Sequence, residues 1–152
     1  ARNILSLSVK DDGRGMDKET VSKVLDPFYT TRTTRRVGLG LPFLKQSAEL
    51  CGGLLRLDSE PGKGTTLEAS FSLDSIDRPP LGNIPSTLVT LLADSPAVHW
   101  TYRHICDGRV FTFDSEEVVA VLEDPEMLRS AEVALWLRDF LRENIEATEH
   151  PS

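Results

Sequence analysis

Residues 4–15 have the sequence ILSLSVKDDGRG, in which a strand pattern runs directly into a glycine turn. Leu5, Leu7 and Val9 alternate with polar residues, which is the period-two pattern of a strand with one buried face. The strand is predicted to end at Asp11, and the two glycines that follow permit a sharp turn and a close approach of backbone segments. This stretch therefore predicts a carboxylate held at the end of a strand.

Helix and strand patterns follow this turn. Asp17 is predicted to cap a helix that ends near Pro27, and residues 41–50 have the pattern of a second helix. Two further strands are predicted around residues 55–57 and 67–73, with a turn between them. We predict an α/β fold of the two-layer α+β kind, in which helices cover one face of a mixed sheet.

The clearest boundary in the chain is the pair of prolines at positions 79 and 80. Proline donates no ladder hydrogen bond and constrains the residue before it. We therefore divide the chain into residues 1–73, a linker over residues 74–85 and a small α+β appendage over residues 86–152.

A β-hairpin and a final helix are predicted in the appendage. Asp107-Gly108 is a strong short hairpin signal, and it predicts a hairpin over about residues 97–113. Helical spacing of apolar residues predicts the final helix over about residues 130–146. The hairpin register places five ring-bearing side chains on one face, which the final helix should cover: Trp100, Tyr102, His104, Phe111 and Phe113.

The composition is that of an ordinary globular protein of 152 residues, 39% of them hydrophobic, with a net charge of −7. No apolar run approaches the roughly 18 residues needed to cross a bilayer, so we expect a cytoplasmic location and no membrane contact. The negative charge argues against nucleic-acid binding. Cys51 and Cys106 match no metal or redox spacing, and we expect reduced thiols.

A basic cluster in this acidic chain favours a small anionic ligand. Arg32, Arg35 and Arg36 crowd a short stretch, and Gly38-Leu39-Gly40 follows just before a predicted helix. The free amides and dipole of such a helix can hold phosphate oxygens. Taken alone, the stretch also fits a solvated loop and a tight connection.

The turn after the first strand fits recognition of a base. Asp11 can accept a hydrogen bond from an exocyclic amine such as that of adenine, while Gly13 and Gly15 leave space for a ring. Turns and calcium loops also use Asp and Gly, so this pentapeptide alone is a weak signal.

Four motifs in order resemble the histidine-kinase-like ATPase family (GHKL, the gyrase, histidine kinase and MutL type) over residues 1–73. Asp11–Gly15 resembles the family's first glycine box, and residues 26–31 resemble its phenylalanine box. Gly38–Leu41 resembles the second glycine box, and Gly62–Thr65 resembles the final Gly-x-Gly-Thr.

The resemblance implies an ATP site. Asp11 would bind the adenine amino group, Thr65 would support that contact through water, and Gly13 and Gly15 would shape the base pocket. Residues 29–40 would form a lid over the triphosphate.

Within this lid, the resemblance implies a hinge at Gly38 and Gly40, with Leu39 between them in the same nucleotide-binding segment. Arg35 or Arg36 would meet phosphate oxygens.

One family motif has no match in this sequence. The family's asparagine box lies on a helix before the first strand and supplies the Asn that coordinates Mg²⁺, whereas Asn3 begins a strand. Because the chain begins at Ala1 without a methionine, we expect a fragment of a longer protein that binds ATP with Mg²⁺. We expect weak nucleotide binding by the fragment and exposed apolar surface that allows a homodimer. No metal ligand or catalytic base is assigned.

Three functions fit these observations. The first is the ATP-binding catalytic domain of a histidine-kinase-like phosphotransferase acting on a protein phosphoacceptor. The second is an anti-sigma-type regulator that phosphorylates a serine on a partner or sequesters that partner. The third is a noncatalytic partner-binding module with a vestigial pocket. His99 and His104 are expected in strands, and His104 is interpreted as a packed residue rather than a phosphoacceptor.

Overall fold

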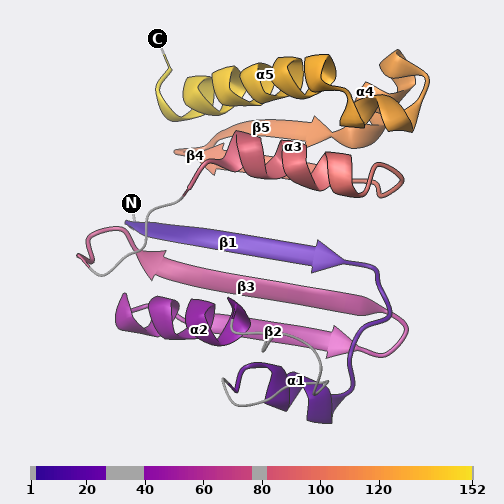
Figure 1. Ribbon diagram of the computed structural model, residues 1–152. Helices are drawn as coiled ribbons and strands as arrows, with labels where there is room; N and C mark the ends of the chain where they lie inside the picture. Colours follow the sequence, from indigo (N-terminus) through magenta and orange to yellow (C-terminus); the bar gives the residue numbers. More distant parts are fainter. Residues whose placement is uncertain (1–2, 27–39, 77–81, 152) are drawn as a thin grey trace. The chain divides into compact units, whose positions relative to one another are not determined.

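The structure is a computed structural model that describes residues 3–26, 40–76 and 82–151 (Figure 1). It divides into two compact units, residues 1–80 and residues 81–152. The two hydrophobic clusters of the structure share no residue, and each lies within one unit. In the described part of the chain, no helix has the length and apolar character needed to cross a bilayer.

The first unit is a three-stranded sheet with two helices. Its elements are β1 (Ile4–Asp11), α1 (Lys18–Val24), α2 (Gly40–Leu50), β2 (Leu55–Glu60) and β3 (Gly64–Ser72). The strand order is β1-β3-β2, and both pairings are antiparallel. These strands therefore do not form the mixed sheet that was predicted, because β1 and β2 flank β3 and both run opposite to it.

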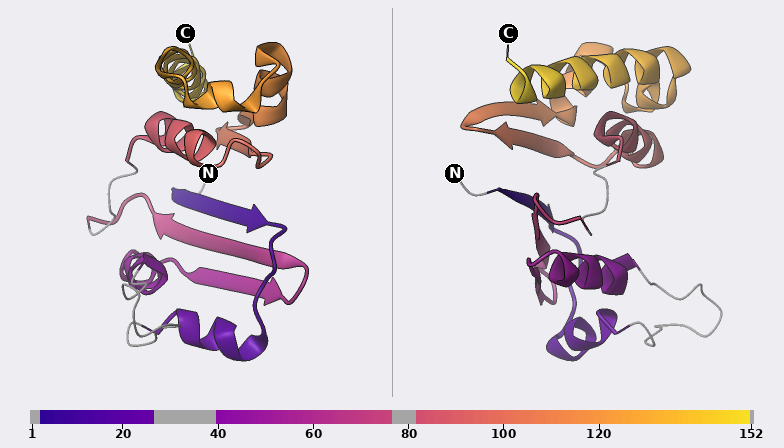
Figure 2. Two further views of the ribbon diagram at one scale, coloured as in Figure 1. Left: turned by 45° about the vertical axis from the view of Figure 1, so that its right-hand side comes forward. Right: turned by 90° about the vertical axis from the view of Figure 1, so that its left-hand side faces the viewer.

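Helix α2 covers one face of this sheet, and Figure 2 shows α1 and α2 on the same side of the strands. Ala48 of α2 and Cys51, which follows α2 directly, pack with Ala69 and Phe71 of β3, and all four are buried. Asp17 caps α1 as predicted, because its side chain accepts a hydrogen bond from the Thr20 amide. The arrangement is α+β with helices on one face, as expected.

Strand β1 is less buried than its alternation predicted. Leu5 packs against the core, but Leu7 is 41% exposed and Val9 is 51% exposed. Helix α2 packs on β3 and on the edge strand β2, and β1 is the edge strand on the other side of β3. The prediction of a buried face was therefore wrong for Leu7 and Val9, which belong to the exposed apolar surface that was also expected.

The second unit packs helices around a two-stranded hairpin. Its elements are α3 (Ile84–Asp94), β4 (Thr101–Cys106), β5 (Arg109–Asp114), α4 (Ser115–Leu122), a 3-10 helix η1 (Pro125–Arg129) and α5 (Ala131–Glu149). Asp107 and Gly108 form the turn with positive φ angles of 49° and 80°. The predicted register is confirmed, since His104 pairs with Phe111 and Tyr102 with Phe113.

The core of this unit lies between the hairpin and the helices. Leu92, Phe113, Leu128, Leu137 and Leu141 form its buried cluster. Helix α5 contacts both strands, so the final helix covers the hairpin as predicted.

Two details concern the starts of elements in the second unit. Ser130 occupies the N-cap position of α5 and makes no side-chain capping bond. His99 lies before β4 rather than within a strand, because ladder pairing begins at Thr101. The Trp100 amide instead donates to the Ser115 hydroxyl.

Candidate functional site

The predicted carboxylate lies at the end of β1. Asp11 Oδ1 accepts a hydrogen bond from the Gly13 amide at 2.9 Å, so the side chain is held against its own turn. Oδ2 has no hydrogen-bond partner among the described residues. Asp11 pairs directly with Thr65 of β3, and directly opposed residues place their side chains on the same face of a sheet. The structure therefore brings together Asp11 and Thr65, the two residues to which the resemblance assigns one contact.

The β2–β3 turn closes onto the loop that follows Asp11. Gly15 has a φ of +70°, and a Cβ added there would collide with the Glu60 carbonyl. Gly64 has a φ of +114°, and a Cβ there would collide with the Asp11 carbonyl. The Gly62 amide donates to the Arg14 carbonyl at 2.7 Å. Glycine at positions 15 and 64 thus permits the close contact between the two segments.

Gly13 differs from these two glycines. A Cβ at Gly13 would meet only the Asp11 carboxyl, 3.1 Å from Oδ1. Apart from the two neighbours of Gly13 in the chain, the described residues place no other heavy atom within 4 Å of that Cβ position.

Ser59 of β2 links these segments, and sequence reasoning missed it. Its hydroxyl accepts from the Met16 amide at 2.8 Å, donates to the Gly64 carbonyl at 2.9 Å, and lies 2.9 Å from Thr65 Oγ1. The sequence signal that could have found Ser59 is its position two residues after Leu57, which places its hydroxyl on the partly buried face of β2. Ser59 thus connects the loop after β1 to the start of β3.

These contacts determine which atom accepts the hydroxyl proton of Thr65. A serine hydroxyl has one proton to donate, and Ser59 has the Gly64 carbonyl as an acceptor. With that proton so placed, Thr65 donates to Ser59 across their 2.9 Å contact. The remaining lone pairs of Thr65 Oγ1 can then accept a hydrogen bond from water.

The phosphate-binding part of the sequence prediction lies largely outside the described residues. Arg35, Arg36, Gly38 and Leu39 belong to residues 27–39, which the structure does not describe. Gly40 begins α2.

Residues 2–75 match the family described as histidine kinase-, DNA gyrase B-, and HSP90-like ATPase. The first unit belongs to this family. It is an ATP-binding domain of the kind found in histidine kinases, and we call it the ATPase unit.

Several curated proteins are similar to the ATPase unit. Sensor histidine kinase WalK of Bacillus subtilis is 44% identical over 69 residues, which cover 42% of this chain and 11% of WalK. Sporulation kinase C of the same organism is 38% identical over 69 residues, 45% of this chain and 16% of that protein. Histidine protein kinase 1 of Candida albicans is 37% identical over 76 residues, 47% of this chain and 3% of that protein. The chain thus matches only a small part of each relative.

Outside the ATPase unit, one cluster combines metal-ligand residue types. His99, Asp114 and Glu116 form the only such group of three among the described residues. His99 Nε2 lies 2.7 Å from Asp114 Oδ1, and Nδ1 lies 3.3 Å from Glu116 Oε1. Since each ring nitrogen faces a different carboxylate, the imidazole bridges two acids. We assign the cluster a structural role, because its contacts link the segment before β4 to the start of α4.

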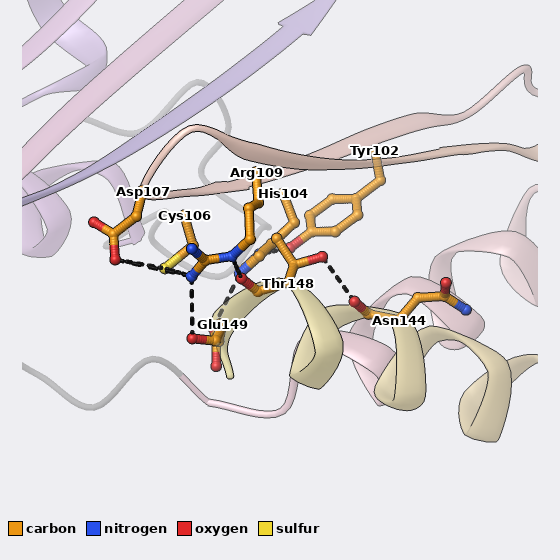
Figure 3. A network of polar contacts seen from close by, with 8 residues as sticks. All are labelled: Tyr102, His104, Cys106, Asp107, Arg109, Asn144, Thr148 and Glu149. Carbon is orange, nitrogen blue, oxygen red and sulfur yellow. Dashed lines mark hydrogen bonds and ion pairs between the residues drawn. The ribbon is translucent and has the colours of Figure 1, made fainter. Parts of the chain in front are cut away.

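A second polar network ties the hairpin to the end of α5 (Figure 3). His104 Nδ1 lies 2.8 Å from Tyr102 Oη, and its Nε2 lies 2.9 Å from Glu149 Oε1. Arg109 Nε donates to the Thr148 carbonyl at 2.7 Å. Burial, and then the Glu149 charge, raise the pKa of Tyr102 to about 12. His104 has partners at both ring nitrogens, which agrees with its interpretation as a packed residue.

Proposed function

We propose that the ATPase unit binds the adenine amino group of ATP on Asp11 and acts in the cytoplasm as the catalytic domain of a histidine-kinase-like phosphotransferase. The observation that carries this proposal is the geometry of Asp11. One carboxylate oxygen is occupied by the Gly13 amide, and the other has no partner among the described residues. The carboxylate also shares a sheet face with Thr65.

Adenine fits these groups chemically. Its exocyclic amine is a donor, and an ionised carboxylate only accepts hydrogen bonds. Thr65 Oγ1 can accept from a water between the sheet and the base, and Gly13 adds no side chain beside the carboxylate. Guanine has a carbonyl oxygen where adenine has its amine, so Asp11 should oppose it.

The phosphates are assigned to the remaining predicted residues as part of this proposal. Arg35 or Arg36 would pair with phosphate oxygens, and Gly38, Leu39 and Gly40 would approach the phosphates through their backbone. Mg²⁺ would accompany ATP, and the proposal assigns it no ligand in this chain.

The proposed reaction moves the γ-phosphoryl group of ATP to a protein acceptor and releases ADP. The names of WalK and of the Candida relative, both histidine kinases, support a histidine acceptor. Such transfer depends mainly on positioning and on neutralising charge around the triphosphate.

The test compares ATP with GTP. Amide chemical shifts of the full chain are followed during titration with each nucleotide in the presence of Mg²⁺, which also detects weak binding. We expect ATP to shift the signals of Gly13, Gly15 and Thr65, and to bind about tenfold or more tightly than GTP, since a hydrogen bond to a charged group is worth roughly 1.5–3 kcal/mol.

Asp11→Asn should remove most of this preference, because an Asn side chain can both donate and accept. Asp12→Asn is the matched control, since Asp12 is exposed and the replacement removes the same charge from the neighbouring position. Equal binding of ATP and GTP by the wild-type chain, or an equal loss in both variants, would reject Asp11 as the base-recognising residue.

A further inference from the structure

The second unit is strongly acidic. Residues 81–152 contain five arginines and no lysine, against thirteen aspartates and glutamates. Residues 1–80 are nearly balanced, with twelve basic and eleven acidic side chains. The net charge of −7 therefore comes from the second unit, which lies outside the proposed ATP site.

An aromatic ledge, formed by Trp136, Phe140 and Phe111, lies where α5 meets β5. Trp136 and Phe140 are one helical turn apart and stack with ring centroids 5.5 Å apart and planes 15° apart. Phe111 meets Phe140 edge-on with centroids 6.1 Å apart. Trp136 still exposes 57% of its surface. Phe140 stacks against the indole, and more than half of the Trp136 surface stays open to solvent.

Carboxylates border the ledge. Glu132 and Asp139 lie one turn before and after Trp136, and Glu143 lies one turn after Phe140. Asp139 is paired with Arg142 at 3.1 Å. Glu132 and Glu143 are exposed, and neither makes a hydrogen bond or ion pair with any residue that the structure describes. Two uncompensated negative charges therefore flank an open aromatic face.

We propose that the aromatic ledge, together with Glu132 and Glu143, is a docking surface for a basic segment of a partner protein. A cation above an indole ring is attracted by the negative π face, and a guanidinium can also stack flat on it. Further basic side chains of the segment pair with Glu132 and Glu143. The partner thus carries arginine or lysine at the contact.

Charge favours a basic protein segment over the other candidate partners, which are nucleic acid, anionic lipid and a second copy of the chain. Nucleic acid and anionic lipid would be repelled by the acidic unit. A second copy that packed on the ledge through its own second unit would bring two negative surfaces together. A basic protein segment is the occupant whose charge complements Glu132 and Glu143.

The test uses the full chain and a fluorescein-labelled short peptide of alternating arginine and alanine, with binding followed by fluorescence anisotropy at physiological salt. The same peptide with glutamine in place of arginine reports contributions that do not depend on charge. We expect Trp136→Ala to weaken binding of the arginine peptide about fivefold, the order expected for an exposed cation–π contact.

Two charge variants separate the ledge from the general acidity of the unit. Glu132→Gln with Glu143→Gln should weaken binding about fivefold, whereas Glu117→Gln with Glu123→Gln should change it less than about twofold. Both variants remove two exposed carboxylates, and the second pair lies at α4 rather than on α5. The glutamates do not pack in the core, so these variants remain informative if Trp136→Ala fails to fold.

Several results would overturn the proposal. These are no measurable binding of the arginine peptide, equal binding of the glutamine peptide, equal weakening by the two charge variants, or unchanged binding in a folded Trp136→Ala variant. A dimer of the free chain that dissociates in Trp136→Ala would place a second copy on the ledge, and would also overturn it.

Discussion

At the scale of single residues, the ATPase unit depends on glycines that let two backbone segments touch. Gly15→Ala should cost about 2–5 kcal/mol, because the side chain is unfavourable at a φ of +70° and its Cβ would collide with the Glu60 carbonyl. Gly62→Ala is the matched control, since Gly62 has a φ of +79° but nothing within 4 Å of an added Cβ. We expect this control to cost only about 1 kcal/mol.

The measurement is urea unfolding followed through amide signals of β1 and β3. Equal destabilisation by Gly15→Ala and Gly62→Ala would show that the contact between the loop after β1 and the β2–β3 turn contributes little to stability.

Among single residues of the candidate site, some were predictable from the sequence and others were not. Asp11 and Thr65 belong to recognisable motifs, and the ladder places them opposite each other. Ser59 was missed because its role arises from contacts to Met16, Gly64 and Thr65, which come from different segments. A lone hydroxyl in a strand gives no sequence signal of such a long-range contact.

At the scale of elements, locally encoded structure was predictable and structure that depends on packing was not. The hairpin follows from Asp107-Gly108 and from alternation, so even its register was predicted. Helix α4 was missed because valine at positions 118, 119 and 121 favours strands, whereas the observed helix starts at the Asp114 cap and packs against η1. The exposure of Leu7 and Val9 likewise depends on how far α2 reaches across the sheet.

The network between β4 and α5 predicts an alkaline transition of the second unit. In the unfolded chain a tyrosine loses its proton near pH 10, whereas folded Tyr102 keeps its proton until about pH 12. Unfolding therefore releases a proton between these values, and stability falls as the pH rises from 10 to 12. The loss should not exceed about 2 kcal/mol, because Tyr102 is only half-buried.

Tryptophan fluorescence during urea unfolding at several pH values measures this effect, since Trp100 and Trp136 both lie in the second unit. Residues 81–152 contain no lysine and no other tyrosine, so few groups compete in this interval. Tyr102→Phe should reduce the loss of stability between pH 10 and pH 12. An unchanged decline in that variant would assign the transition to another group.

At the scale of the whole molecule, two separate cores imply two stability units. Leu137 is fully buried in the second core, whereas Leu135 on the same helix is 52% exposed. Leu137→Ala should destabilise the second unit by about 2–5 kcal/mol, because it removes buried methyl groups and leaves a cavity. Leu135→Ala should cost less than about 1 kcal/mol.

The informative readout is the behaviour of the ATPase unit in these variants. Its core of Ala48, Cys51, Ala69 and Phe71 shares no residue with the second core, so the amide signals of β1 and β3 should keep the urea midpoint of the wild-type chain. Leu137→Ala should shift only the tryptophan-detected transition. If the β1 and β3 signals are lost at the same lower urea concentration as the tryptophan signal, the two units unfold as one cooperative body, and a partner bound on the second unit could stabilise the ATP site through folding alone.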